Sequence, residues 1–205
     1  MAKVVTPAEW HRPVWEAGVP APNLCAQVLR LRAGSSGPRG AGVRQRVTEP
    51  RDNDHVGQGS FPGGKCEPAD QDVVHTALRE TQEELGLTVP EDRVWGALQP
   101  VYDQAKNTVV PVLAGVGPLD PQRLKPNPEE VEEVFALPLA HLLQAQNQGY
   151  THFCRGGHFR YTMPVFLHGP HRVWGLTAII TEFTLQLLAP GAYQPRLDFP
   201  GWRRG

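Results

Sequence analysis

The sequence lacks the features that identify membrane-spanning and disulfide-rich secreted proteins. No apolar run in its 205 residues approaches the ~18 residues that a membrane-spanning helix requires. The three cysteines, Cys25, Cys66 and Cys154, are odd in number and far apart, so they match neither a zinc-binding spacing nor a disulfide framework. We therefore expect a protein of a reducing compartment, without a membrane partner.

The chain also lacks a charge excess of either sign. Twenty Lys and Arg residues stand against 21 Asp and Glu residues, which gives a net charge of -1. Proteins that coat nucleic acid carry a strongly positive balance, so we expect no nucleic-acid partner. Hydrophobic residues, at 40%, suffice for a core, whereas 21 Gly and 21 Pro residues predict many turns rather than a helix bundle.

The length of the chain predicts one domain with tails, and hydrophobic periodicity predicts both strands and helices within residues 24–190. An irregular arm is expected before this domain, at residues 1–23, and a loose tail after it, at residues 191–205. Alternation of apolar and polar residues with a period of two predicts the strands of the domain. The expected strands cover residues 24–31, 94–101, 109–116 and 159–167.

Apolar residues at helical spacing predict two helices, at residues 72–85 and 173–188. The first helix begins after Asp70 or Asp72, either of which can cap its N-terminus, and Gly86 ends it.

Residues 32–54 differ from the rest of the expected domain. This segment has five Arg, four Gly and two Pro residues, and no Leu, Ile or Phe. The composition predicts a basic loop, with at most a weak strand at Val43–Thr48. A loop of ~20 residues without structure of its own is uncommon inside a compact domain.

An acidic face on the first helix carries the clearest chemical signal. Glu80, Glu83 and Glu84 stand at positions i, i+3 and i+4, so all three point to one side and repel one another. A divalent cation removes this repulsion, and carboxylate oxygens suit magnesium, which keeps water and substrate phosphates as its other ligands. Arg79 can bridge and orient these carboxylates, and the preceding Gly63-Gly64 turn allows a close backbone approach. The simpler interpretation, a solvated charged face, stays open from these residues alone.

The stretch GGKCEPADQDVVHTALRETQEELGL at residues 63–87 resembles the Nudix box, G-x5-E-x7-R-E-U-x-E-E-x-G-U, where U is a bulky apolar residue. The matching residues are Gly64, Arg79, Glu80, Glu83, Glu84, Gly86 and Leu87. Asp70 takes the place of the first acid, one residue further from Arg79 than in the box, and Thr81 takes the first apolar place. The motifs FPGGK at 61–65 and ALRETQEE at 77–84 resemble the coenzyme A pyrophosphatase branch of the family, and this resemblance extends to about Arg196.

The resemblance implies an α/β/α sandwich with a mixed sheet. It also implies metal-dependent hydrolysis of the pyrophosphate bond of coenzyme A or acyl-CoA, which releases 3′,5′-ADP and a 4′-phosphopantetheine species. Glu80 and Glu84 are then expected to bind Mg²⁺ or Mn²⁺, with Glu83 as a further ligand or a base and Arg79 as the residue that orients them.

Other residues receive roles from the same resemblance. Gly64 and Lys65 are expected beside the substrate phosphates, and Asp70 is expected to secure the start of the helix. The acidic run at residues 129–133 could supply a more distant base, although such runs are usually solvated surface. A basic segment at residues 155–161 could bind the 3′-phosphate or adenine, with surface again the alternative. Tyr102 is expected in the core or in a pocket wall.

The resemblance fails upstream of residue 57, where the branch carries an apolar strand of the form L-L-T-x-R. Residues 32–54 cannot supply that strand, so three functions stay open: a coenzyme A diphosphatase, a Nudix hydrolase of another dinucleotide such as NADH or ADP-ribose, and a catalytically impaired binding module. The branch resemblance implies a mitochondrial location. Residues 1–20, with two Glu and no Ser, do not look like a transit peptide, so a cytoplasmic location is the alternative.

Overall fold

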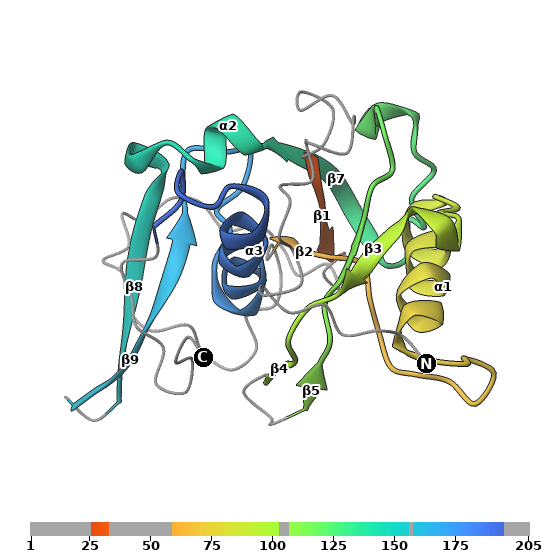
Figure 1. Ribbon diagram of the computed structural model, residues 1–205, viewed down its shortest axis with the longest axis horizontal. Coiled ribbons are helices and arrows are strands. Elements are labelled where there is room, and N and C mark those ends of the chain that lie inside the picture. Colours follow the sequence, from red (N-terminus) through yellow and green to blue (C-terminus); the bar gives the residue numbers. More distant parts are fainter. Residues whose placement is uncertain (1–25, 33–58, 103–106, 156–157, 195–205) are drawn as a thin grey trace, which may run out of the picture.

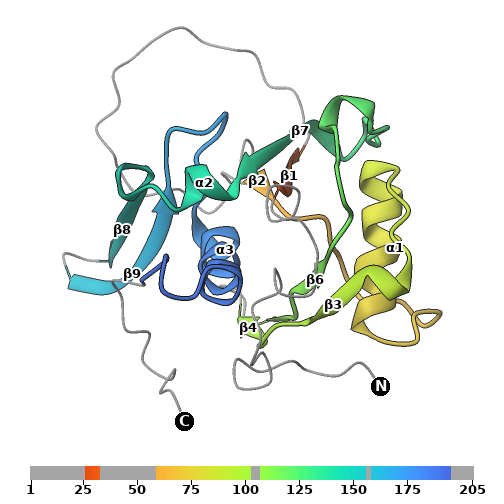
Figure 2. The ribbon, with the colours of Figure 1, turned by 45° about the horizontal axis from the view of Figure 1, so that its top comes forward.

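The computed structural model describes the backbone of residues 26–32, 59–102, 107–155 and 158–194, and side chains within 59–102, 107–152 and 162–194. These residues form α/β structure, as predicted (Figure 1). Helices α1 and α3 lie on opposite sides of strands β1, β2 and β3 in both ribbon views (Figures 1 and 2). No helix in the described part of the chain is long and apolar enough to cross a membrane.

The first helix forms where the sequence predicts it. Helix α1 covers Val73–Leu85, and the Asp72 side chain caps it by accepting hydrogen bonds from the backbone N–H groups of Val74 and His75. Gly86 ends the helix at φ 63°, a left-handed conformation that favours glycine.

A three-stranded antiparallel sheet forms part of the layer between the two long helices. Strand β1 (Ala26–Arg32) pairs along its length with β7 (Val131–Pro138), and its end pairs with the short β2 (Gly59–Ser60). Phe135 and Leu137 of β7 are buried, because alternate residues of a strand point to opposite faces. They join a core cluster that also contains Leu142, Phe166, Val173, Ala178, Leu185 and Tyr193.

The other described strands form antiparallel pairs. Strand β3 (Val94–Ala97) pairs with β6 (Val112–Ala114), and β4 (Val101–Tyr102) pairs with β5 (Thr108–Val109). A long hairpin joins β8 (Gln148–Arg155) to β9 (His158–Phe166). The remaining elements are α2 (Leu139–Leu142), α3 (Gly175–Leu188) and three short 3₁₀ turns, η4 (Glu91–Arg93), η5 (Pro121–Arg123) and η6 (Ala145–Asn147).

The predicted strand at residues 94–101 is divided between β3 and β4, and the one at 109–116 is divided between β5 and β6. Pro111, between β5 and β6, has no N–H to continue a ladder. Strand β8 was not predicted, because Gly149 and several polar residues weaken its alternation. Residues 1–23, residues 33–54 and most of the predicted tail lie outside the described residues.

Candidate functional site

Helix α1 presents its three glutamates at very different depths. The Glu84 residue is buried, with 3% of its surface exposed. The Glu80 side chain is 15% exposed, whereas that of Glu83 is 54% exposed. Two of the predicted metal ligands therefore lie at the boundary between the core and the surface, and the third reaches into solvent.

Arg79 is the centre of the site's electrostatics. Its guanidinium lies within ion-pair distance of four carboxylates, those of Glu67 (3.7 Å), Asp70 (3.0 Å), Glu80 (3.3 Å) and Glu83 (2.9 Å). The hydrogen bonds with Asp70 raise the pKa of Arg79, which keeps it charged. One positive charge cannot balance four negative ones, so the site retains a net negative charge.

Asp70 connects the glycine-rich turn to the helix. Its carboxylate accepts hydrogen bonds from Arg79 Nε (3.1 Å) and Nη2 (3.0 Å), from Thr76 Oγ1 (2.9 Å) and from the backbone N–H of Glu67 (2.8 Å). The Arg79 hydrogen bond, followed by the Glu67 N–H, lowers the pKa of Asp70. Of the two residues predicted as possible caps, Asp72 is the cap, while Asp70 secures the first turn through Thr76.

The Gly63-Gly64 turn lies directly against the acidic face. A β-carbon on Gly64 would lie 2.1 Å from Glu80 Oε1, so only glycine leaves room for this carboxylate. Lys65 follows the turn, and its backbone carbonyl accepts a hydrogen bond from Arg79 Nη2 at 3.1 Å. The structure thus brings Gly64, Lys65, Arg79 and Glu80 together, while their predicted roles toward metal and substrate stay predictions.

The side chains around Arg79 fit a divalent cation in their chemistry. Their donors are carboxylate oxygens, which Mg²⁺ and Mn²⁺ prefer, and their charges exceed what Arg79 balances. Within the described residues, however, no three His, Cys, Asp or Glu side chains already form a group that could hold a metal ion. The assignment of Glu80, Glu83 and Glu84 as ligands therefore remains a prediction.

A loop about 40 residues further along the chain holds the C-terminus of α1. The backbone N–H of Asn127 donates to the carbonyl oxygen of Glu84 (2.9 Å), and that of Lys125 donates to Leu85 (3.3 Å). Gly86 packs closely on this loop, since a β-carbon there would lie 2.7 Å from the Lys125 carbonyl oxygen.

A partly open apolar cavity of about 510 Å³ lies between α1 and α3. The first helix contributes Ala77, Thr81 and Leu85 to its lining, and the second contributes Ile180 and Leu185. Residues of β2, β5, β6 and the Gly63-Gly64 turn complete the wall. The cavity therefore lies between the two long helices, beside the strands.

The less favoured candidates differ in what the structure shows of them. Tyr102 is 69% exposed, so its predicted place in the core or a pocket wall is wrong. The acidic residues 129, 130, 132 and 133 are exposed, and Glu133 pairs with His171 at 2.9 Å. Side chains at 155–161 lie outside the described residues.

Sequence reasoning missed three residues that contact the site: Glu67, Thr76 and Asn127. The sequence indicates a turn at Asn127, which stands between two prolines. It does not indicate the contact of Asn127 with Glu84, which lies 43 positions earlier.

Comparisons with known proteins show which family this chain belongs to. Residues 43–154 match the model of the NUDIX domain. The chain is 85% identical over 143 residues to the human mitochondrial coenzyme A diphosphatase NUDT8, an alignment that covers 70% of this chain and 61% of the human protein. It is 75% identical over 151 residues to the mouse protein of the same name, covering 74% of this chain and 72% of that protein. Nudix hydrolase 3 of Caenorhabditis elegans is 34% identical over 160 residues, an alignment that covers 68% of this chain and 64% of that protein.

Proposed function

The chain belongs to the Nudix family, and we propose that it hydrolyses the pyrophosphate bond of coenzyme A or acyl-CoA. The products would be 3′,5′-ADP and 4′-phosphopantetheine or its acyl derivative. The observation that carries this proposal is the cluster of four carboxylates around Arg79 beside the Gly63-Gly64 turn. The human and mouse relatives named as coenzyme A diphosphatases support the choice of substrate.

Residues of α1 would bind the metal ion and orient its ligands. Glu80 and Glu84 would hold the metal ion, and Glu83 would act as a further ligand or as a base. Arg79 would fix the directions of the Glu80 and Glu83 carboxylates through its contacts at 3.3 and 2.9 Å. When bound, Mg²⁺ or Mn²⁺ supplies positive charge against the pyrophosphate and lowers the pKa of a water molecule.

The glycine-rich turn would bind the substrate's phosphates. Gly64 has no side chain, so its backbone lies directly against the Glu80 carboxylate, and a substrate phosphate bound by the turn would be next to the proposed metal ligands. Lys65 is exposed, and its ammonium group can offset the charge of the pyrophosphate. Asp70 would keep this turn in place relative to α1 through its bonds to Glu67 and Arg79.

The finer architecture belongs to the same proposal. Family membership and the position of α1 and α3 on either side of strands support an α/β/α sandwich with a mixed sheet. We take the Nudix domain to cover residues 24–190, with an arm before it and a tail after it. The human and mouse relatives, both named mitochondrial coenzyme A diphosphatases, support a mitochondrial location, which imaging of a C-terminally tagged chain tests. A diffuse cytosolic signal would contradict that location.

A catalytically impaired Nudix module is the second candidate. The apolar cavity between α1 and α3 favours it, because an unfilled space beside the catalytic helix would leave its carboxylates loosely held.

One experiment separates these functions. The purified chain is incubated with coenzyme A, acyl-CoAs, NADH or ADP-ribose, with Mg²⁺, Mn²⁺ or EDTA, and the products are identified by mass spectrometry. Metal-dependent release of 3′,5′-ADP from coenzyme A is expected. Cleavage of NADH or ADP-ribose alone would show that the chain acts on another class of Nudix substrate. Binding of coenzyme A without products would support the impaired module.

A further inference from the structure

The C-terminal turn of α1 depends on a segment that is distant in sequence. The last carbonyl groups of a helix have no partners within the helix, so this end frays unless other groups bind them. In α1 the loop at residues 125–127 binds two of them, those of Glu84 and Leu85. The buried Glu84 therefore sits in the turn that this loop holds.

Asn127 itself is held in a fixed turn. Its Oδ1 accepts a hydrogen bond from the backbone N–H of Glu129 (3.1 Å). Its carbonyl oxygen accepts hydrogen bonds from the N–H groups of Glu130 (3.2 Å) and Val131 (2.8 Å). Val131 is buried and begins β7, the strand that pairs along β1. The turn thus connects the core sheet to the end of α1.

We propose that Asn127 is a positioning residue for Glu84. Its side chain shapes the turn at the start of β7, the turn directs the Asn127 N–H onto the Glu84 carbonyl, and this bond fixes the helical turn that carries the Glu84 carboxylate. This inference rests on the proposed function to the extent that Glu84 binds the metal. Loss of the side-chain oxygen of Asn127 should weaken metal binding without removing a ligand.

The chain offers a matched control in the same loop. Asp120 forms the same kind of turn, since its Oδ1 accepts a hydrogen bond from the N–H of Gln122 at 3.0 Å. Asp120 caps the short η5 turn, and among the described residues no hydrogen bond or ion pair joins its side chain to α1. Replacing Asp120 with Ala therefore removes an equivalent side-chain bond from the loop while leaving the end of α1 held.

The test compares Asn127→Ala, Asn127→Ser and Asp120→Ala with the wild-type chain. Mn²⁺ affinity is measured by electron paramagnetic resonance, exchange of the α1 amides by mass spectrometry, and kcat and KM with coenzyme A. Asn127→Ala should bind Mn²⁺ ~10-fold more weakly, the usual effect of losing a residue that orients a metal ligand. It should also exchange faster in the last turn of α1 and lower kcat more than it changes KM. Ser, whose hydroxyl can form the same turn, should restore most of the affinity, and Asp120→Ala should match the wild type.

The possible failures are distinguishable. Wild-type Mn²⁺ affinity in Asn127→Ala would overturn the inference, as would an equal loss in Asp120→Ala or no Mn²⁺ binding by the wild type. If Asn127→Ala weakens Mn²⁺ binding as expected but the wild type does not hydrolyse coenzyme A, the positioning role stands and the proposed substrate is wrong.

Discussion

Gly64 of the glycine-rich turn and Glu80 of helix α1 lie in direct contact. A β-carbon on Gly64 would lie 2.1 Å from Glu80 Oε1 and 2.6 Å from its Cδ. The backbone of Gly64 is not in the left-handed region, so an alanine there meets no conformational penalty of its own. The only obstacle to an alanine at this position is therefore a steric clash with the carboxylate of Glu80, which is the end of a flexible side chain.

Gly64→Ala should consequently displace the Glu80 carboxylate rather than unfold the protein. We expect a fall in kcat/KM of about 10- to 100-fold, equivalent to ~1.4–2.7 kcal/mol, with little change in the melting temperature. A double-mutant cycle provides the control. In a Glu80→Ala background, Gly64→Ala should cause almost no further fall in kcat/KM. An equally large effect in that background would show that Gly64 acts independently of Glu80.

Glu84→Gln and Glu80→Gln should abolish most turnover while the fold persists. Each change keeps the shape of the side chain and removes one negative charge from the proposed metal-binding face. Loss of a metal-activated nucleophile should lower kcat at least ~100-fold, or ~2.7 kcal/mol. Glu91→Gln makes the same chemical change at an exposed residue of η4 and should leave kcat unchanged. Near-normal turnover of Glu84→Gln at saturating Mg²⁺ would contradict the assignment.

Local signals predicted helix α1 better than they predicted the sheet. Asp72, Gly86 and the spacing of the glutamates predict α1 because helix signals act within a few residues. The contact between Asn127 and Glu84 and the pairing of β1 with β7 depend on chain folding over long distances, which no local pattern records. The burial of Glu84 could not be predicted either, because the spacing of the glutamates predicts only that Glu84 shares a helix face with Glu80.

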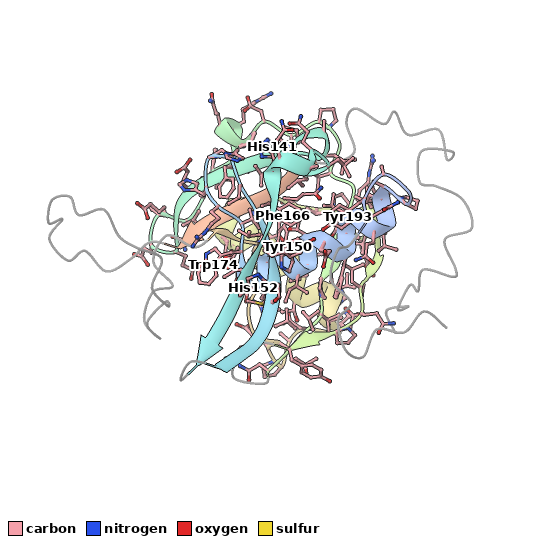
Figure 3. All side chains as sticks on the ribbon, turned by 90° about the vertical axis from the view of Figure 1, so that its left-hand side faces the viewer. His141, Tyr150, His152, Phe166, Trp174 and Tyr193 are labelled. Carbon is pink, nitrogen blue, oxygen red and sulfur yellow. The ribbon has the colours of Figure 1, made fainter. Side chains whose placement is uncertain are left out.

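A buried carboxyl group on α3 should make stability depend on pH. Glu182 is fully buried; its Oε1 accepts a hydrogen bond from the Tyr193 hydroxyl (2.7 Å), and its Oε2 has no hydrogen-bond partner among the described residues. Tyr193, which Figure 3 shows beside α3, also lies in the core. Burial raises the pKa of Glu182, because the charged form loses its hydration.

The raised pKa of Glu182 determines whether stability rises or falls with pH. Below the ordinary glutamate pKa, Glu182 is protonated in the folded and unfolded states, so its ionisation does not oppose folding. As the pH rises through the folded-state pKa, the group ionises more readily in the unfolded chain and the fold loses stability. Glu182→Gln should therefore melt at a higher temperature than the wild type near pH 8, and the difference should shrink toward pH 4.

Tyr193→Phe supplies the opposite control for this pH dependence. The Tyr193 hydroxyl bonds to the carboxylate and lowers the pKa of Glu182, so its removal should raise that pKa further and decrease stability near pH 8. Thermal melts from pH 4 to pH 8 measure all three proteins. A constant difference between Glu182→Gln and the wild type over this range would show that Glu182 does not titrate as we expect.

The cavity between α1 and α3 should limit both stability and turnover. The cavity leaves apolar side chains of α1 and α3 without packing partners, and each such side chain would contribute ~1.5–3 kcal/mol if buried, against the ~5–15 kcal/mol stability of a whole domain. The segment at residues 32–54, with no Leu, Ile or Phe, offers little apolar surface to fill it. We therefore expect a low melting temperature, protease cleavage between Arg32 and Asp54, and slow turnover.

Supplying apolar side chains at Val43–Thr48 should reverse these properties. The triple variant Arg44→Leu, Gln45→Val and Arg46→Ile gives a continuous apolar run, as expected of a strand buried on both faces. Each buried side chain contributes ~1.5–3 kcal/mol, and 1 kcal/mol corresponds to ~2–4 °C, so the melting temperature should rise by roughly 10 °C or more. Cleavage should slow and kcat should increase. Arg44→Gln with Arg46→Gln removes the same charges without adding apolar surface and should produce neither change. A wild-type chain that already protects residues 43–48 from hydrogen exchange and turns over as fast as the triple variant would show that these residues build the strand unaided.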